Sequence, residues 1–509
     1  MSLFGAGVNR ICAVAAAATA RQLQALVRAG LRETHTVELR LDWLRDDKER
    51  HAFLGWLKKQ RFPRANFVAT CRRRVGGGEF ASDAGAELYW LIKARDAGCA
   101  WCDLEVETLR ELPGESARGF NLPANVLVSL HDFQRTPPLP KNLKLTKRSG
   151  LAAIKLAAMS RTLADSARLL TGARRGSGRA GSHIVTVPMG EVGLPARILA
   201  LRAGSALAYA PVAAATAPGQ VSLRDLKYLY RAHELTVKSD VYGVIGNPIG
   251  HSLSPLLHNT GYVAAKKDAV FLSFLVESLG DFLNVVADFG VRGFSITLPH
   301  KQAIFKYLKD CEPLAKEIAA VNTVTVRKDG SLYGSNTDYL GVLRALENKI
   351  RLPGSRVLIF GAGGSARAAA FAVARAGAET FICARRPEAA RKLARAVKCE
   401  TLPRSELRKQ KFDALINATP VGMHPHDGIS PLTARELNCS LVMDLIYRPL
   451  QTKLLGLAAK AGIATISGVE MFLAQGLAQW ELWMKTKAPE AKMRQAVVAA
   501  LQAEEKCRK

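Results

Sequence analysis

Residues 356–377 read RVLIFGAGGSARAAAFAVARAG and carry the pattern that decides the fold of the second half of the chain. A short apolar run, a glycine-rich turn and an alanine-rich stretch of helical periodicity predict a strand, a turn and a helix. Glycines there let a pyrophosphate approach the backbone at the amino terminus of the helix. The turn departs from strict GxGxxG spacing, but its context predicts dinucleotide contacts at Gly361, Ala362, Gly363, Gly364, Ser365 and Ala366.

The end of the next predicted strand indicates which dinucleotide binds. Sites for NAD commonly place an acidic residue about 20 residues after the glycines, where it holds the ribose hydroxyls. This chain instead has Ala384, Arg385 and Arg386 at that place. Two guanidinium groups suit the 2′-phosphate of NADP, so we predict NADP as the cofactor. The alternative is that both arginines are solvated surface residues.

Two polar residues upstream of this turn form a candidate catalytic pair. Lys301 ends the segment GFSITLPHK, and Asp338 ends the segment GSNTD. Beside a dinucleotide, such a pair can move the proton that accompanies hydride transfer; the alternative is a plain surface salt bridge. Ser252 and Ser254 in GHSLSP offer hydroxyl groups to a polyhydroxylated ring, or else they only shape a turn.

The first half of the chain, from residue 10 to about 235, alternates strand-like runs with amphipathic helix-like runs. The strand-like runs are RICAVAAA, HTVELRLDWL, NFVATCRRR, AWCDLEVE, NVLVSLHDF, LAAIKLAAM, SHIVTVPMG and SALAYAPVA. Eight such units in about 230 residues predict a (β/α)8 TIM barrel, whose active site lies at the carboxyl ends of its strands.

Polar residues inside these apolar strands are the candidate site of the barrel. Lys155 interrupts LAAIKLAAM, and a buried amine of lowered pKa can attack a ketone to form a Schiff base. The alternative is a lysine that is ion-paired with Glu38 or Glu105. His131 ends the preceding strand and is a candidate general acid and base. Three arginines can converge on a carboxylate: Arg40, Arg72 and Arg197.

The composition of the 509 residues is that of a globular chain, with 48% apolar and 23% charged residues. A net charge of +28 implies anionic partners, and without a basic tail we favour sites for small anions over nucleic acid. One CxxC, at Cys99 and Cys102, has no second pair, so we predict no metal site. Prolines interrupt the apolar stretch 203–223, so we predict no membrane span and expect a soluble cytoplasmic protein.

Segments of the first half together resemble type I 3-dehydroquinate dehydratase over residues 10–235: VELRLD, TCR…GG, SLHDF…TP, IKLAAMS, VPMGEVGLPAR and APGQ. The resemblance implies that Lys155 forms an imine with the substrate ketone and that His131 moves the protons. It also implies that the substrate site is lined by Glu38, Arg40, Arg72, Arg197, Thr216 and Gln220. Gly76 departs from the family, which usually has a glutamate there that orients the histidine. Thr216 stands where the family often has serine and keeps the hydroxyl group.

The second half resembles shikimate dehydrogenase over residues 240–501, in GNPIGHSLSP, GFSITLPHK, AVNTV, GSNTD, GAGGSARA, NATPVGM, DLIYRP and SGVEMFLAQG. This resemblance implies that Lys301 and Asp338 are the catalytic pair. It implies shikimate contacts from Ser252, Ser254, Thr297, Asn322, Tyr447 and Gln475. It adds NADP contacts at Thr419, Leu445 and Gly468. Ser295 stands where an asparagine is common.

The two resemblances predict an α/β protein, with an N-terminal (β/α)8 TIM barrel followed by a two-subdomain α/β shikimate dehydrogenase module that has a Rossmann-like NADP domain. We expect a barrel at 1–236, a substrate subdomain at 240–340, an NADP subdomain at 341–467 and C-terminal helices at 468–509 that pack back on the substrate subdomain. The predicted function is dehydration of 3-dehydroquinate followed by reduction of the product to shikimate with NADPH.

Two rival functions stay open at this point. One is a catabolic quinate or shikimate dehydrogenase that uses NAD, and the other is a basic nucleic-acid-binding protein with an inactive barrel. Because the first predicted strand begins near residue 10 and nothing resembles a plastid transit peptide, we expect a bacterial cytoplasm. The sequence leaves open whether the chain forms a homo-oligomer.

Overall fold

The structure is a computed structural model that describes residues 10–111, 121–123, 125–138, 152–176, 183–213, 220–347, 349–423 and 426–508. The chain divides into two compact units. The first unit comprises Met1–Asp240 and Ser273–Gly290, and the second comprises Val241–Leu272 and Val291–Lys509.

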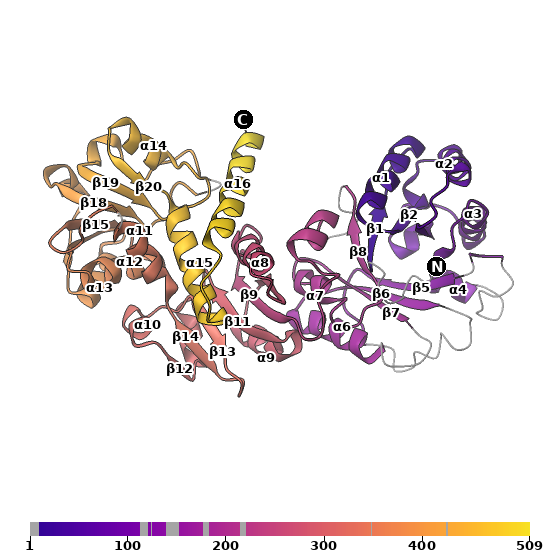
Figure 1. The fold of residues 1–509 in the computed structure, drawn as a ribbon, viewed down its shortest axis with the longest axis horizontal. Coiled ribbons are helices and arrows are strands. Elements are labelled where there is room, and N and C mark those ends of the chain that lie inside the picture. The colour runs from indigo at the N-terminus through magenta and orange to yellow at the C-terminus, as the bar shows by residue number, and fades with distance from the viewer. Residues whose placement is uncertain are drawn as a thin grey trace. The chain divides into compact units, whose positions relative to one another are not determined.

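The first unit is built on a parallel sheet of eight strands, in the order β7-β6-β5-β4-β3-β2-β1-β8 (Figure 1). The strands are β1 Ile11–Ala15, β2 Thr36–Arg40, β3 Asn66–Thr70, β4 Trp101–Glu105, β5 Asn125–Asp132, β6 Ala153–Met159, β7 His183–Met189 and β8 Ala208–Pro211. In the described residues β7 and β8 share no ladder, but the Ala206 N–H donates to the Ile184 carbonyl at 2.7 Å. The predicted barrel is therefore confirmed, as a ring that is nearly closed.

Helices follow most of these strands and cover the outside of the ring (Figure 1). They are α1 Ala20–Glu33, α2 Asp47–Lys59, α3 Ala84–Asp96, α4 Val106–Glu111, α6 Leu163–Gly176 and α7 Leu194–Leu199. Thr19, Asp46 and Asp83 cap α1, α2 and α3, because each side chain accepts a backbone N–H of the first turn. In the same unit α9, Leu279–Phe289, packs against α6.

The barrel interior changes from apolar to polar along the strands. One end is filled by a cluster that includes Cys12, Val14, Val68, Trp101, Leu127, Ala153, Val185 and Tyr209. Further along, the buried residues are charged: Glu38, Arg40, Asp103, Glu105 and Lys155. A layer of apolar side chains thus supports a buried group of charges near the carboxyl ends of the strands, where barrels carry their active sites.

The second sheet is mixed, in the order β10-β9-β11-β13-β14-β12. Its strands are β9 Asp240–Gly246, β10 Ala269–Leu275, β11 Val291–Ile296, β12 Asp310–Cys311, β13 Thr323–Val326 and β14 Leu332–Ser335. β9 pairs with β11 in parallel, whereas β13 is antiparallel to both β11 and β14. Nearby helical segments are α8 Ser254–Ala264, η5 Ala303–Tyr307, α10 Pro313–Ile318 and α11 Thr337–Glu347.

The third sheet is parallel, in the order β17-β16-β15-β18-β19-β20, which is the order of a doubly wound dinucleotide-binding fold. Its strands are β15 Arg356–Phe360, β16 Glu379–Cys383, β17 Glu400–Thr401, β18 Phe412–Asn417, β19 Cys439–Asp444 and β20 Ala464–Ile466. Alternate residues of β15 enter different clusters, Val357 and Ile359 in one and Leu358 and Phe360 in the other. Both faces of the sheet are therefore buried, and the predicted Rossmann-like domain is confirmed.

Helices complete the second unit. They are α12 Gly364–Arg375, α13 Pro387–Val397, α14 Lys453–Lys460, α15 Gly468–Met484 and α16 Glu490–Arg508. α15 packs against α11, and α16 packs against α8. Among the helices of the described residues, none combines the length and the hydropathy needed to cross a membrane.

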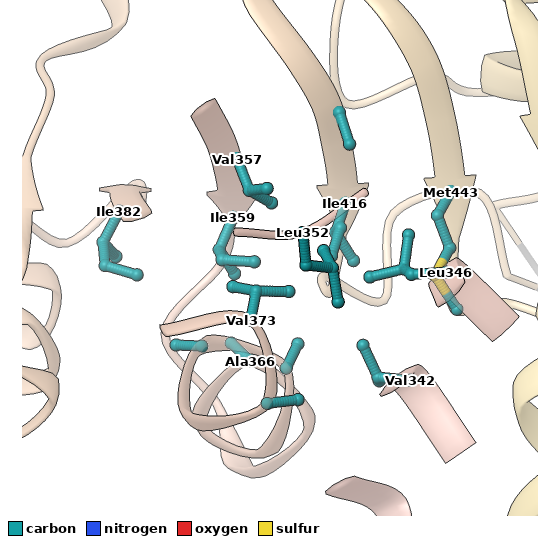
Figure 2. Close-up of a cluster of buried hydrophobic side chains, with 14 of the residues drawn as sticks. Val342, Leu346, Leu352, Val357, Ile359, Ala366, Val373, Ile382, Ile416 and Met443 are labelled. Carbon is teal, nitrogen blue, oxygen red and sulfur yellow. The ribbon is translucent and has the colours of Figure 1, made fainter. Parts of the chain in front are cut away.

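Ile359 lies in the middle of the cluster between the third sheet and α12, next to Val357 and Val373 (Figure 2). We predict that Ile359→Ala lowers the free energy of unfolding of the second unit by about 2–5 kcal/mol, because the side chain is fully buried. Chemical denaturation, monitored through the loss of dinucleotide binding, measures this decrease in the free energy of unfolding. The exposed Arg391→Ala serves as the control, and equal stability of the two variants would contradict the packing described here.

Candidate active sites

Lys155 of β6 lies at the centre of the charged group inside the barrel. Its Nζ donates to Asp103 Oδ2 of β4 at 2.7 Å and to Glu38 Oε1 of β2 at 3.1 Å. The same atom lies 4.1 Å from the ring centroid of Tyr209 on β8. Three strands therefore direct side chains onto the ammonium group of Lys155, whose side chain is only 5% exposed.

This ion pairing answers the alternative that the sequence left open for Lys155. The lysine is paired with Glu38, as that alternative predicts, but its second partner is Asp103 rather than Glu105. Although burial alone would raise it, the charges of Lys155 and Arg72 hold the pKa of Asp103 below its usual range. Asp103 is thus ionised, and sequence reasoning did not single it out.

The three arginines predicted to converge on a carboxylate have different surroundings. Arg40 Nε and Nη2 donate to Asp42 at 2.9 and 2.6 Å, and Arg72 Nη2 donates to Asp103 at 3.2 Å. Arg197 Nε and Nη2 both donate to the Pro188 carbonyl, at 3.0 and 2.7 Å. Its Nη1 has no hydrogen-bond partner among the described residues, and burial lowers the pKa of Arg197 to about 10. Nη1 is the group of Arg197 that stays available for an anion.

His131 lies on β5, the strand that pairs with the strand of Lys155. Ser129 is in register with Lys155, and His131 follows two residues later, so it lies further toward the carboxyl end. Its ring stacks on Phe133 with the centroids 6.1 Å apart. Burial, together with the charges of Arg72 and Lys155, lowers the pKa of His131 well below its usual value. The imidazole is therefore neutral at neutral pH and can accept a proton.

The remaining predicted residues of the barrel site lie in the segment after β8. Gln220 is described and is partly buried. Thr216 lies outside the described residues. Its predicted contact stays a prediction.

In the second unit, Lys301 Nζ donates to Asp338 Oδ2 at 2.5 Å, so the predicted pair is brought together. Lys301 follows β11, and Asp338 lies in the first turn of α11. Asn322 Nδ2 donates to the other oxygen of Asp338, Oδ1, at 2.7 Å. Three of the predicted residues thus form one chain of contacts, and the lysine keeps two further protons for a ligand.

A buried amide network supports this chain, and the sequence reasoning missed most of it. Gln479 of α15 donates to Gln475 Oε1 at 2.7 Å and to Thr337 Oγ1 at 3.4 Å. Asn322 Nδ2 donates to the same Thr337 oxygen at 3.0 Å. His258, neutral because burial lowers its pKa to about 4, lies 3.2 Å from Gln479 Oε1. The helical spacing of Gln475 and Gln479, one turn apart, was the available signal.

The other predicted shikimate contacts lie around the loop before α8. The Ser252 hydroxyl accepts the backbone N–H of Ser254 at 3.3 Å, so this serine also shapes a turn. Tyr447 stacks on Phe472 with a centroid separation of 4.6 Å, and its hydroxyl interacts with the backbone of Leu253. Thr297 packs against Gly246, where a Cβ would lie 2.4 Å from Thr297 Cγ2.

The glycine-rich turn fits a dinucleotide. Gly361 has a φ of 130°, and a Cβ on it would lie 3.0 Å from the Ala418 carbonyl oxygen. Gly363 is the N-cap of α12, and a Cβ there would meet nothing within 4 Å. At Gly364 the nearest atom would be Lys301 Cδ, at 3.8 Å. The turn therefore leaves open space at a helix amino terminus, next to Lys301.

The predicted NADP residues outside the turn lie at the ends of other strands of the same sheet. Ala384, Arg385 and Arg386 follow β16, and both arginines are exposed. Thr419 follows β18, and its hydroxyl donates to Asn417 Oδ1 at 2.8 Å. Leu445 directly follows β19, and a Cβ on Gly468 would lie 2.7 Å from the Leu445 carbonyl carbon.

Comparison with known proteins matches three parts of the chain to protein families. Residues 11–236 match the family of type I 3-dehydroquinase, residues 244–324 match the substrate-binding domain of shikimate dehydrogenase, and residues 468–498 match the C-terminal domain of shikimate 5′-dehydrogenase. A solved shikimate dehydrogenase in complex with NADP+ superposes with a TM-score of 0.50 and 34% identity, covering 52% of this chain and 97% of that one.

Two curated relatives extend the comparison. The NADP(+)-dependent shikimate dehydrogenase of Bacillus mycoides is 40% identical over 278 residues, which are 51% of this chain and 98% of the relative. The chloroplastic bifunctional 3-dehydroquinate dehydratase/shikimate dehydrogenase of Arabidopsis thaliana is 32% identical over 482 residues, which are 89% of this chain and 78% of the relative. Because this second match spans both units, the chain belongs to the family of bifunctional 3-dehydroquinate dehydratase/shikimate dehydrogenases.

Proposed function

We propose that the barrel converts 3-dehydroquinate to 3-dehydroshikimate through an imine on Lys155, and that the second unit reduces this ketone to shikimate with NADPH. The observation that carries the proposal is the pair of lysine–carboxylate contacts, Lys155 with Asp103 and Lys301 with Asp338. The direct test is to give the pure protein 3-dehydroquinate and NADPH and to measure shikimate.

In the barrel, the chemistry starts from an ammonium group that must lose a proton. The neutral His131 is the base nearest along the neighbouring strand, and Asp103 and Glu38 hold the nitrogen in place. The free amine adds to the ketone, and His131 returns its proton to the hydroxyl group of the adduct, which departs as water. A protonated imine and a neutral His131 remain. This cation withdraws electrons from the adjacent carbon and makes its proton acidic.

His131 then completes the elimination. The imidazole accepts the proton from the carbon and afterwards gives it to the hydroxyl group on the next carbon, which departs as water. Water hydrolyses the imine, releases the product and returns the amine of Lys155. The overall balance is the loss of one water. We assign the substrate carboxylate and hydroxyls to Glu38, Arg40, Arg72, Arg197, Thr216 and Gln220.

In the second unit, the chain holds the ketone and supplies a proton. When bound, NADPH supplies the hydride. Lys301 gives a proton to the carbonyl oxygen as it becomes a hydroxyl, and Asp338 orients the ammonium group. We assign the ring hydroxyls and carboxylate to Ser252, Ser254, Thr297, Asn322, Tyr447 and Gln475.

The cofactor assignment rests on the turn and on two arginines. The backbone at Gly361–Ala366 would receive the pyrophosphate, and Arg385 and Arg386 would hold the 2′-phosphate. The similar enzyme of Bacillus mycoides is named as NADP(+)-dependent. The rival hypothesis, an enzyme that prefers NAD, would require an acidic residue at this position, and this chain has none there.

The binding partners of the chain are small molecules. We infer a cytoplasmic location, and a homo-oligomer remains to be tested by measuring the mass in solution. The net charge of +28 exceeds what two sites for small anions use. If the protein binds nucleic acid, it should strongly retard DNA in a gel-shift experiment at physiological salt.

For Lys155→Ala, we predict loss of dehydratase activity with shikimate oxidation unchanged, because only the barrel loses its nucleophile. Steady-state assays of each half reaction measure the two effects. Lys227→Ala, which removes a lysine paired with Glu33, is the matched control and should keep both activities. Dehydration at wild-type rate by the Lys155→Ala variant would contradict the imine.

Asp103→Asn should reduce dehydratase turnover and destabilise the barrel by about 3–5 kcal/mol, because it leaves two buried cations with one carboxylate fewer. The thermal midpoint and the dehydratase rate of the variant report these losses. Asp96→Asn, at an exposed aspartate, provides the comparison. Equal thermal midpoints and dehydratase rates in the two variants would refute this role of Asp103.

We expect Lys301→Ala to lower kcat of shikimate oxidation by about 10²–10⁴-fold, with little change in the affinity for NADP, since the lysine acts as acid and base. Dehydratase activity should be preserved. Lys306→Ala, an exposed lysine five positions on, is the control. A variant that loses NADP affinity but keeps kcat would show a different role for Lys301.

Replacing Arg385 and Arg386 together by alanine should weaken NADP binding by about 10–100-fold while NAD binding changes little, as expected for lost hydrogen bonds to a charged group. Fluorescence titration with each cofactor measures both affinities. Arg391 and Arg395, exposed on α13, are the matched pair for the control variant. Equal losses for NADP and NAD would show that the first pair is only surface charge.

A further inference from the structure

Gly76, noted above as a departure from the family, lies against the carboxyl group of Glu105. A Cβ on Gly76 would lie 2.0 Å from Glu105 Oε1 and 2.4 Å from its Cδ. The backbone of Gly76 does not have a positive φ, so its conformation does not demand glycine. The demand is spatial, because the Glu105 carboxyl occupies the position that a side chain at 76 would enter.

The buried carboxyl of Glu105 has one charged neighbour in contact. Arg72 Nε lies 3.1 Å from Glu105 Oε1, and the glutamate is 2% exposed. Neither carboxyl oxygen makes a directed hydrogen bond within the described part of the chain. Arg72 Nη2 donates to Asp103 and Arg72 Nε lies beside Glu105, so two carboxyl groups face one edge of this guanidinium, and Nη1 takes part in neither contact.

We propose that Glu105 is a positioning residue that holds Arg72 for the substrate carboxylate, and that residue 76 is glycine to make room for it. The proposal rests on the assignment of Arg72 to the substrate under the proposed function. Gly76 and Glu105 are then complementary: Glu105 at the end of β4 supplies the carboxyl group, and the loop after β3, which carries Gly76, has none at that position.

The charge state of Glu105 fits this role. Burial raises its pKa to about 8, against the opposing charge of Arg72. The charged groups around it are Arg72 and Arg73 after β3, Asp103 on β4, Glu87 on α3 and Glu107 on α4. Below pH 8 the carboxyl group of Glu105 is neutral, so it can contact Arg72 without offsetting the positive charge of the guanidinium group. Above pH 8 the carboxylate competes with the substrate for Arg72.

The first experiment moves the carboxyl group from the strand to the loop in the full-length protein. Glu105→Ala should raise KM for 3-dehydroquinate at least about 10-fold and change kcat less, as expected for lost ground-state binding. Adding Gly76→Glu to Glu105→Ala should bring KM most of the way back. Gly55→Glu, at a glycine with nothing within 4 Å of its Cβ, controls for the added glutamate.

The second experiment uses the conservative variant and pH, and does not depend on how Gly76→Glu folds. Glu105→Gln should raise KM less than Glu105→Ala at pH 7, because the amide oxygen can still face Arg72. In the wild type KM should rise as the pH passes 8, and in Glu105→Gln this rise should be absent. A purely structural role for Glu105 would leave the pH dependence of KM unchanged.

Arg72→Met separates failure of this proposal from failure of the function on which it rests. An unchanged KM in Arg72→Met would overturn the assignment of Arg72 to the substrate. If Arg72→Met raises KM but Glu105→Ala does not, only the positioning role fails. It fails also if the carboxyl swap leaves KM as high as in Glu105→Ala while the swapped variant keeps the wild-type thermal midpoint. Shikimate oxidation by the second unit verifies the enzyme concentration in every variant.

Discussion

The dehydratase half of the molecule depends on one buried ammonium group and the two carboxylates that hold it. Taking the charge of Lys155 out of water costs several kcal/mol, so the barrel must provide Asp103 and Glu38 within hydrogen-bond distance. These carboxylates fix the nitrogen in the barrel interior, and the neighbouring strand β5 carries the neutral His131 two residues beyond the register partner of Lys155. The proposed nucleophile and the proposed base are thus placed by strand register.

In the second unit, amide side chains position the lysine–carboxylate pair. Lys301 is less buried than Lys155, with 16% of its side chain exposed, and has one carboxylate partner, Asp338. The orientation of Asp338 is set by Asn322, and through Thr337 by Gln479 of the C-terminal helix α15. Neutral hydrogen bonds can fix a catalytic pair without adding charge that would compete with an anionic substrate.

Much of the fold could be predicted, because both periodicities were strong. Eight apolar runs marked the barrel strands, and the glycine-rich turn marked the first strand and helix of the dinucleotide-binding sheet. The partner of Lys155 was predicted only in part. Glu38 was foreseen, but choosing between Asp103 and Glu105 needs the register of β4, and both residues point inward there. Likewise, the pairing of Arg40 with Asp42 could not be predicted from composition or spacing.

Trapping of the imine tests the central claim most directly. The wild-type protein would be treated with 3-dehydroquinate and borohydride, digested, and mapped by mass spectrometry. The account predicts one substrate adduct, on the β6 peptide that contains Lys155. An adduct on another lysine, or no adduct in a protein that still dehydrates the substrate, would contradict it.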